Sequence, residues 1–327
     1  MAAWLLTSLS SSSSHVRTPL IHSTPITQAL RNQKQSAQTH AMLKMDAMQL
    51  SGSFKDRGMA HMCKTLKKQG KSYLISSSGG NAGLAAATMG NKLGINVRVV
   101  VPTTTKPLML DKMRAQNANV TIHGDNWNAA DELARQLVAE SDGKAAYVPP
   151  FEDPLLWEGH STLIDELAED GVKPGVIVAS VGGGGLLCGI LLGLRRHGWE
   201  DVAVYAAETQ GASCFAAAVE AGKPVRLEAI RSVATSLGAL EVSPNAYRLA
   251  QEHGQVRSVV VSDREAIDAC TRFLDDHRVL VEPACGAALA VGYSHGAVLS
   301  EFDSVVFVVC GGSGVNLSIL REWESKV

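Results

Sequence analysis

One lysine in this chain stands where its amine can do covalent chemistry. Lys55 follows the small residues and single aromatic ring of Ser51 to Phe54, and it opens an expected helix with apolar positions at Met59, Met62 and Leu66. The pKa of a lysine falls readily on burial, and the neutral amine can form an imine with an aldehyde cofactor and later act as a base. Lys55 is therefore the candidate catalytic residue. The alternative is a lysine on the solvated face of a helix start, which is the commoner situation.

Four consecutive glycines form a candidate phosphate site. Gly182, Gly183, Gly184 and Gly185 lie between an expected strand and an expected helix. Backbone N–H groups in such a turn can converge on an anion, and the helix dipole adds to the attraction. Leu186 follows where a Walker loop has lysine, and the G-x-G-x-x-G pattern is absent. The turn favours a single phosphate group over a nucleotide, with a purely structural turn as the alternative.

A second helix start carries hydroxyl and amide groups. The segment Ser76 to Gly83 also lies between an expected strand and an expected helix. N–H groups and hydroxyls at a helix start suit a carboxylate, which makes Ser78, Gly79, Gly80 and Asn81 candidate substrate-binding residues. For Asn81 the alternative is a helix N-cap. A phosphate site beside a carboxylate site indicates a phosphorylated cofactor that meets an amino acid.

A cysteine at the end of an apolar run is the last candidate. Cys310 follows the expected strand Val305 to Val309 and precedes Gly311-Gly312-Ser313-Gly314. Ligands of open α/β sheets gather beyond the carboxyl ends of the strands, although most cysteines in apolar runs are core residues. The histidines show no metal-binding spacing, so we expect no transition-metal site.

Alternating strands and helices must position these groups. Asn126 to Glu140 reads as a helix with a buried stripe that begins at Trp127, and Ser262 with Glu265 forms a capping box before another helix. The alternation indicates two α/β units, each with a parallel sheet, and a cleft between them. The expected strands are Tyr73 to Ser76, Val97 to Val101, Val120 to Ile122, Gly175 to Val181, Val202 to Ala207, Val256 to Val261 and Val305 to Val309, of which the last four read as buried.

Composition excludes several classes of protein. The chain has 327 residues, 46% of them hydrophobic and 19% charged, with a formal net charge of -2 and scattered basic residues. We therefore expect a globular protein of about two domains, no nucleic-acid partner and no membrane span. Six dispersed cysteines without a C-x-x-C pair indicate reduced thiols and a cytoplasmic protein. Residues 1–14 read as a disordered tail, with organelle targeting as the open alternative.

Taken together, these motifs resemble the fold type II pyridoxal-phosphate enzymes, and among them the serine dehydratase group. The resemblance extends over Arg17 to Leu20, Ser51 to Lys55, Ser76 to Gly83, Pro149 to Phe151, Trp157 to His160, Gly182 to Gly185, Val281 to Gly286 and Cys310 to Gly312. It implies a tryptophan synthase beta-like fold with two open parallel-sheet domains and the cofactor in the cleft. The implied bounds are 15–45 plus 153–327 for a large cofactor-binding domain and 46–152 for a small substrate-binding domain. The resemblance also implies a homodimer.

The same resemblance implies a role for each candidate residue. Lys55 forms the Schiff base with pyridoxal phosphate, Gly182 to Gly185 with Leu186 hold its phosphate, and Cys310 faces its pyridine nitrogen. Asn81 bonds the ring hydroxyl, Phe54 and Ser236 flank the ring, and Ser78, Gly79, Gly80 and Asn81 receive the substrate carboxylate. A potassium ion is implied at Gly182, Glu208, Ala212, Leu237 and Ala239.

The implied reaction is elimination from L-serine to give pyruvate and ammonia, and from L-threonine to give 2-oxobutyrate. Three alternatives stay open. Asp56 after the lysine resembles threonine synthase; serine racemase has a serine at the position of Gly79; and a cofactor-binding pseudoenzyme fits the same motifs. Two further departures from the group are the polar segment Gln28 to Thr39, where it has a strand, and Gly314, where it often has asparagine.

Overall fold

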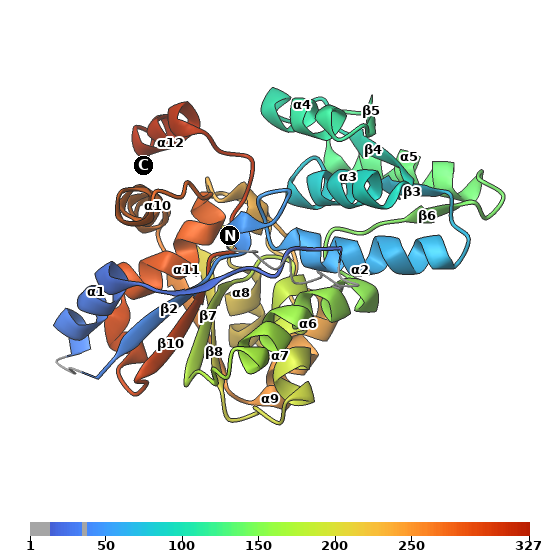
Figure 1. Cartoon of the computed structure of the whole chain (residues 1–327). Coiled ribbons are helices and arrows are strands. Elements are labelled where there is room, and N and C mark those ends of the chain that lie inside the picture. Colours follow the sequence, from blue (N-terminus) through green and yellow to red (C-terminus); the bar gives the residue numbers. More distant parts are fainter. Residues whose placement is uncertain (1–13, 35–37) are drawn as a thin grey trace, which may run out of the picture.

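The computed structural model describes residues 14–34 and 38–327. It contains two separate sheets flanked by helices, as the alternation of strands and helices predicts (Figure 1). The tail predicted for residues 1–14 lies outside the described residues except for Ser14. The domain bounds inferred from the resemblance stay a prediction.

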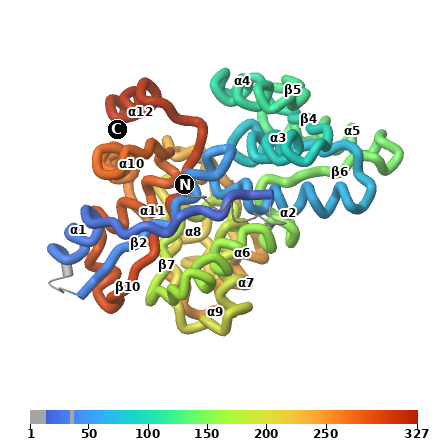
Figure 2. The backbone as a smooth tube through the Cα atoms, in the orientation of Figure 1, coloured from blue at the N-terminus to red at the C-terminus, as the bar shows by residue number. Residues whose placement is uncertain are grey.

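The larger sheet has six strands in the order β1-β2-β10-β7-β8-β9. All neighbouring strands pair in parallel except β1 and β2, which are antiparallel. The tube trace shows β2, near the beginning of the chain, beside β10 near its end (Figure 2). The strands are β1 Leu20–His22, β2 His40–Lys44, β7 Val176–Ser180, β8 Ala203–Thr209, β9 Val256–Val261 and β10 Ser304–Val308.

The smaller sheet has four parallel strands in the order β5-β4-β3-β6. They are β3 Tyr73–Ser76, β4 Asn96–Val101, β5 Asn119–Ile122 and β6 Ala145–Tyr147. One face is covered by α5, which buries Ala130 and Ala134 against the sheet residues Ile75 and Val100. The other face is covered by α3, and the two layers leave the carboxyl ends of β3 and β4 free to carry loops.

The helices agree closely with the sequence pattern. The predicted capping box at Ser262 and Glu265 is confirmed at the start of α10. The helices are α1 Thr24–Lys34, α2 Lys55–Lys68, α3 Asn81–Leu93, α4 Pro107–Ala115, α5 Trp127–Ala139, α6 Pro154–Glu169, α7 Gly185–Arg196, α8 Cys214–Ala221, α9 Pro244–His253, α10 Asp263–His277, α11 Pro283–Ser294 and α12 Leu317–Glu324. Short 3₁₀ turns lie at η1 Asp46–Met48, η2 Thr235–Leu237 and η3 Gly296–Leu299.

Two expectations about burial need correction, and the polar departure from the group can be placed in the structure. Strand β9 was expected to be buried, but it is the edge strand of its sheet and only Val261 is buried. Trp127 was placed on the buried stripe of α5, but it is the first residue of the helix and 46% exposed. Within the polar segment Gln28 to Thr39, residues 28–34 belong to α1, where polar residues alternate with inward-facing residues such as Leu30.

Helix α2 packs against both halves of the molecule, touching α3 on one side and α6 on the other. Two glycines permit the close approach to α6: a β-carbon on Gly159 would lie 2.3 Å from the carbonyl oxygen of Arg57, and one on Gly58 would lie 2.5 Å from His160. The residue that carries the candidate amine is therefore at the N-terminal end of a helix that is held from two sides.

A buried ion network fixes the same end of α2. The Arg57 guanidinium is fully buried and donates to both oxygens of Asp46 at 2.8 Å and to Glu166 of α6 at 2.6 and 2.9 Å. Lys44 of β2, also fully buried, pairs with Glu166 at 2.6 Å. Because each charge has an opposite partner, the network joins η1, α2, α6 and the large sheet without leaving an uncompensated ion inside.

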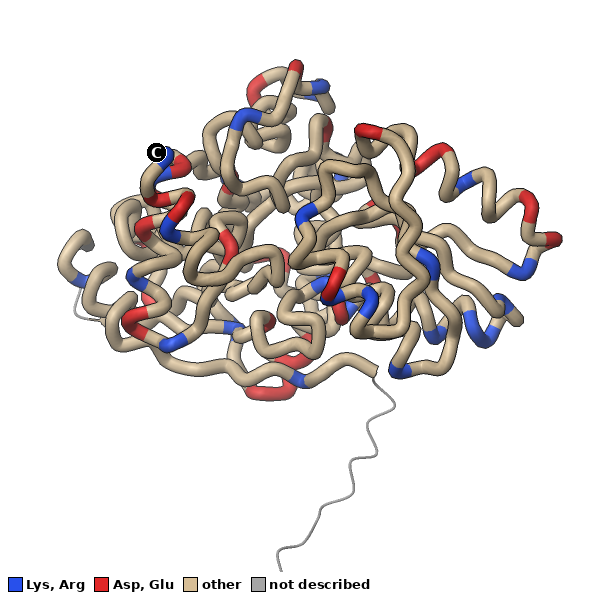
Figure 3. Tube along the Cα trace, turned by 90° about the horizontal axis from the view of Figure 1, so that it is seen from above, with Lys and Arg blue, Asp and Glu red and all other residues tan. Residues whose placement is uncertain are grey.

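The surface and the thiols give two further observations. Lysine and arginine are interspersed with aspartate and glutamate along the trace seen from above (Figure 3). The cysteines are all free, in accordance with the prediction of reduced thiols. Among the described residues, no helix combines the length and the apolar character needed to cross a membrane.

Candidate active site

A cleft of about 1020 Å³ lies where loops that follow strands of both sheets meet. Nearly all of the predicted site residues line it. They are Phe54, Lys55, Ser78, Gly79, Gly80, Asn81, Gly182, Gly183, Gly184, Gly185, Leu186, Ser236, Leu237, Ala239 and Cys310. Glu208 and Ala212, predicted as potassium ligands, are fully buried behind this lining. The structure thus collects residues from five well separated parts of the sequence around one space.

Lys55 is the first residue of α2, and its amine lies inside the cleft. The chain enters the helix through Gly52, whose φ of 82° needs a residue without a side chain, and the Phe54 N–H donates to the Cys310 carbonyl at 3.1 Å. The Lys55 Nζ donates to the Pro150 carbonyl at 2.5 Å. Burial lowers the pKa of the Lys55 amine to about 8, although Cys310 acts in the opposite direction. A substantial neutral fraction is therefore present at physiological pH, as nucleophilic and basic roles require.

The glycine turn between β7 and α7 is shaped for a group that approaches its backbone. Gly184 has a φ of 95°, and Gly185 begins the helix, so the helix N-terminus points into the turn. A β-carbon on Gly183 would lie 2.5 Å from the Phe151 ring, and one on Gly182 would lie 3.0 Å from the Cα of Leu237. Side chains are excluded at these positions, which leaves N–H groups as the surface that faces an anion.

The loop from β3 to α3 brings Asn81 into the cleft. The alternative role of Asn81 as an N-cap is wrong, because Gly80 is the cap and Asn81 is the first helical residue. The Asn81 amide instead spans the cleft: its Nδ2 donates to Glu282 at 3.0 Å, and its Oδ1 accepts from the Ser313 N–H at 2.8 Å. The side-chain amide is therefore held in one orientation by two partners from the other half of the chain.

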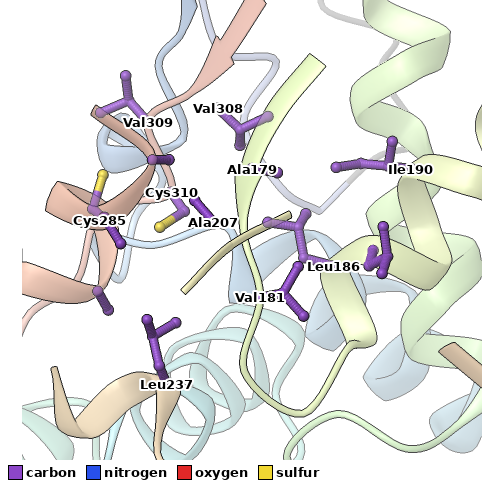
Figure 4. Packing of buried hydrophobic residues seen from close by; sticks show 14 of the residues in the cluster. Ala179, Val181, Leu186, Ile190, Ala207, Leu237, Cys285, Val308, Val309 and Cys310 are labelled. Atoms are coloured by element: carbon purple, nitrogen blue, oxygen red, sulfur yellow. The ribbon is translucent and has the colours of Figure 1, made fainter. Parts of the chain in front are cut away.

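Cys310 is buried at the carboxyl end of β10. The close-up shows Cys310 between Cys285 and Ala207 (Figure 4). Interaction with the Cys285 thiol and burial raise the pKa of Cys310 well above its usual range. Cys310 therefore presents a neutral thiol to the cleft and not a thiolate.

The sequence prediction missed Glu282, which organises one wall of the cleft. This carboxylate is 5% exposed and accepts hydrogen bonds from Asn81, from the Ser236 hydroxyl at 2.5 Å and from the Gly314 N–H at 2.5 Å. A β-carbon on Gly314 would lie 2.8 Å from Glu282 Oε1, which explains why glycine stands there. Its signal in the sequence was a place in the motif Val281 to Gly286, directly before Pro283 at the start of an apolar helix.

Asp56 does not face the cleft, in spite of its place beside Lys55. It is fully buried and accepts a hydrogen bond from the Ser51 N–H at 2.8 Å. Burial raises the pKa of Asp56 to about 6. Its contacts brace the turn that precedes α2, so this departure from the dehydratase pattern does not alter the lining of the site.

Among the predicted potassium ligands, the Glu208 carboxylate already has hydrogen-bond partners within the protein. Glu208, at the end of β8, accepts from the N–H groups of Phe215 and Ala216, both at 2.8 Å, at the start of α8. Burial raises the pKa of Glu208 to about 7, although these two hydrogen bonds act to lower it. The Cys214 thiol lies 3.5 Å from the carbonyl of Gly182, and Ala212 N–H donates to Thr209. Within the described part of the chain, no group of three or more histidine, cysteine, aspartate or glutamate residues is placed to hold a metal ion.

Comparisons with known proteins agree with this geometry. Residues 17–311 match the model of a family described as pyridoxal-phosphate dependent enzyme. The chain is 46% identical over 318 residues to the L-serine dehydratase/L-threonine deaminase of Homo sapiens, covering 94% of this chain and 96% of that protein. It is 44% identical over 322 residues to a serine dehydratase-like protein of Mus musculus, covering 96% and 95%.

Solved structures give the same result. The crystal structure of a fungal L-serine ammonia-lyase from Rhizomucor miehei superimposes with a TM-score of 0.87 and 35% identity, covering 96% of this chain and 99% of that one. Maize serine racemase, 23% identical with a TM-score of 0.85 and coverage of 96% and 93%, shares the fold.

The residues of the cleft fit pyridoxal phosphate on their own chemistry. A buried amine with a lowered pKa suits its aldehyde, a glycine cradle at a helix N-terminus suits its phosphate, and a fixed amide and a neutral thiol suit its ring. With the match over most of its length, this chain belongs to the family of pyridoxal-phosphate dependent enzymes.

Proposed function

We propose that this protein catalyses the pyridoxal-phosphate dependent dehydration and deamination of L-serine to pyruvate and ammonia, and of L-threonine to 2-oxobutyrate. The observation that carries the proposal is the Lys55 amine, buried with a pKa of about 8 in a cleft that also contains the glycine turn and the start of α3. The names of the relatives, L-serine dehydratase/L-threonine deaminase and L-serine ammonia-lyase, support the same reaction.

The protein's own groups hold the cofactor in this proposal. Gly182 to Gly185 and the N-terminus of α7, with Leu186, bind the phosphate, and Asn81 bonds the ring hydroxyl. Phe54 and Ser236 flank the ring. Bound pyridoxal phosphate supplies an aldehyde for covalent attachment and an electron sink for charge that develops at the substrate α-carbon. The neutral Cys310 thiol offers no negative charge to keep the pyridine nitrogen protonated.

Two further groups act on the substrate. The start of α3, with Ser78, Gly79, Gly80 and Asn81, orients the α-carboxylate through N–H groups and hydroxyls. The Lys55 amine, neutral in a substantial fraction of molecules, takes the α-proton at its Nζ. The Pro150 carbonyl, 2.5 Å from Nζ, restricts the direction in which the amine points.

The alternatives receive less support from the site. Asp56 lies outside the cleft lining, so the feature that favoured threonine synthase has no place in substrate binding. Gly79 lacks the hydroxyl that serine racemases carry at this position. The pseudoenzyme alternative is weakened by the presence of Lys55, Asn81 and Cys310 around one cleft.

A product assay tests the proposal. Purified holoenzyme is incubated separately with L-serine, L-threonine and O-phosphohomoserine, and 2-oxoacids, ammonia and threonine are measured. Pyruvate from L-serine with an equal amount of ammonia is the expected result, and Lys55→Ala abolishes it together with the absorbance of the lysine-bound cofactor. Threonine formed from O-phosphohomoserine is the result that contradicts the proposal.

The proposed potassium ion belongs near Glu208. Support comes from the Glu208 carboxylate, because burial raises its pKa to about 7. An adjacent cation would favour the ionised form of this carboxylate. Potassium affinity should then rise with pH and level off above about 7. Exchange of potassium for tetramethylammonium should lower activity in the wild type, whereas Glu208→Gln should make activity insensitive to the exchange. An unchanged wild-type activity contradicts the ion site.

A further inference from the structure

Thr105 lies beside the loop that the proposed function assigns to the substrate carboxylate. Strands β3 and β4 are parallel neighbours, so the segments that follow them meet at one edge of the small sheet. Ser77 to Gly80 follow β3, and the turn from Pro102 to Lys106 follows β4 and ends at α4. The Thr105 N–H donates to the Pro102 carbonyl at 3.1 Å, and Thr105 lines the cleft.

The side chain of Thr105 occupies the space that any side chain at position 79 would need. A β-carbon on Gly79 would lie 2.7 Å from Thr105 Oγ1 and 2.9 Å from its Cγ2, distances that real β-carbons do not tolerate. The Thr105 side chain therefore lies directly against the glycine-rich loop at Gly79. Glycine at 79 is what allows the hydroxyl to reach it.

The hydroxyl is free to bind a ligand. Within residues 14–34 and 38–327, no group forms a hydrogen bond with Thr105 Oγ1. The first N–H groups of α3, which lie beside Thr105, have no side-chain acceptor, because no side chain caps the helix at Gly80. Ser78 Oγ accepts from the Gly80 N–H at 3.3 Å and keeps its own proton to donate. Uncapped N–H groups at the start of α3 and the hydroxyls of Ser78 and Thr105 therefore line the same part of the cleft, a combination that suits a carboxylate.

We propose that Thr105 is a substrate-binding residue that donates its hydroxyl to the α-carboxylate of the amino acid, and that Gly79 is required for this contact. The inference rests on the proposed function, since it concerns the same substrate. It adds a donor from the turn after β4 to a site that otherwise consists of the β3 to α3 loop. Any α-amino acid that enters the cleft meets this contact, whatever its side chain.

Thr105→Val tests the contact, because valine keeps the shape and replaces the hydroxyl with a methyl group. The holoenzyme is titrated with L-alanine, which has no β-leaving group, and binding is followed by the change in cofactor absorbance. Loss of a hydrogen bond to a charged group should raise the Kd for L-alanine about tenfold, and the KM for L-serine by a similar factor. Thr105→Ser should recover most of the affinity, since it keeps the hydroxyl.

Thr103→Val is the matched control. Thr103 belongs to the same turn but is exposed and does not line the cleft, so L-alanine affinity should not change. An unchanged Kd for L-alanine in Thr105→Val overturns the inference. A change for L-serine alone also overturns it, because the hydroxyl would then contact the β-hydroxyl and not the carboxylate.

Gly79→Ala provides a second, independent test. The added methyl group must displace the Thr105 side chain, so affinity for L-alanine should fall, and adding Thr105→Val to Gly79→Ala should cause little further loss. Fully additive losses contradict the requirement for glycine. Failure of the proposed function would appear in the wild-type product assay, whereas failure of this inference would appear in the ratio of variant to wild-type affinity.

Discussion

At the scale of the residue, the Lys55 amine makes a pH dependence predictable. Its pKa is lowered by burial from an ordinary value of 10.5 to about 8. Only the neutral amine attacks an aldehyde, so the rate at which apoprotein captures pyridoxal phosphate should rise with pH and level off above about 8. Rapid-mixing absorbance measurements between pH 6 and 10 check this, with Lys55→Ala as the control. A rate that still rises several-fold between pH 9 and 10 would show an unshifted amine.

Glu282 gives a second prediction at this scale. Glu282→Gln keeps the shape of the side chain but replaces one of the two accepting oxygens, which now serve Asn81, Ser236 and Gly314, with a donor. Because hydrogen bonds to charged groups contribute about 1.5–3 kcal/mol, kcat/KM for L-serine should fall roughly 10- to 100-fold. Steady-state kinetics and the cofactor absorbance spectrum measure the effect.

Glu140→Gln is the control for this substitution, since Glu140 is exposed at the end of α5, outside the cleft lining. It should leave kcat/KM unchanged. If Glu282→Gln also leaves kcat/KM and the spectrum unchanged, Glu282 does not position Asn81.

The sequence revealed some of these residues and concealed others for a physical reason. Lys55 and Gly182 to Gly185 could be found because each carries its own chemistry within a contiguous motif. Glu282 and Thr105 act through partners distant in the chain, at Asn81 and Gly79 respectively, and nothing local identifies those partners. The burial that lowers the pKa of Lys55 is likewise a property of the folded cleft.

At the scale of the element, the buried ion network should make a large contribution to the stability of the N-terminal end of α2, which carries Lys55. Arg57→Ala would leave Asp46 and part of Glu166 as buried charges without their partner. Removing one partner of a buried pair typically costs about 3–5 kcal/mol. Urea unfolding should show a loss of that size, together with reduced cofactor binding because Lys55 lies two residues away.

Arg196→Ala is the matched control, because Arg196 pairs with Glu158 and Asp165 on an exposed surface. Exposed pairs contribute about 0.2–1 kcal/mol, so its effect should be small. A loss below about 1 kcal/mol for Arg57→Ala would indicate that the network does not hold α2.

Periodicity predicted the elements well and their environment less well. The expected strand Tyr73 to Ser76 has the bounds that the structure shows, and the helix expected after Ser76 to Gly83 is α3. The errors at β9 and Trp127 share a cause, because an apolar run indicates a strand or helix without giving its surroundings. It did not show that β9 lies at the edge of its sheet, or that Trp127 is an exposed first residue of α5. Those environments depend on strand order.

At the scale of the whole molecule, strand and helix alternation is enough to predict two parallel sheets. It does not give their order, in which β2 from the beginning of the chain lies next to β10 from its end. The arrangement arises from long-range packing, which places the carboxyl ends of both sheets around one cleft. The domain bounds, the homodimer and the cytoplasmic location stay predictions.

This arrangement implies that the cofactor stabilises the whole protein. Bound pyridoxal phosphate should contact Lys55 and Asn81 on one side of the cleft and Gly182 to Gly185 on the other, so it binds the native state alone. Such a ligand adds about 4 kcal/mol to the free energy of unfolding at a thousandfold excess over its Kd. Removing it should lower Tm by several degrees in thermal unfolding. Pyridoxal, which lacks the phosphate, should restore clearly less of the Tm than pyridoxal phosphate, because it cannot use the glycine turn. Equal recovery by both compounds would mean that the phosphate does not lie at Gly182 to Gly185.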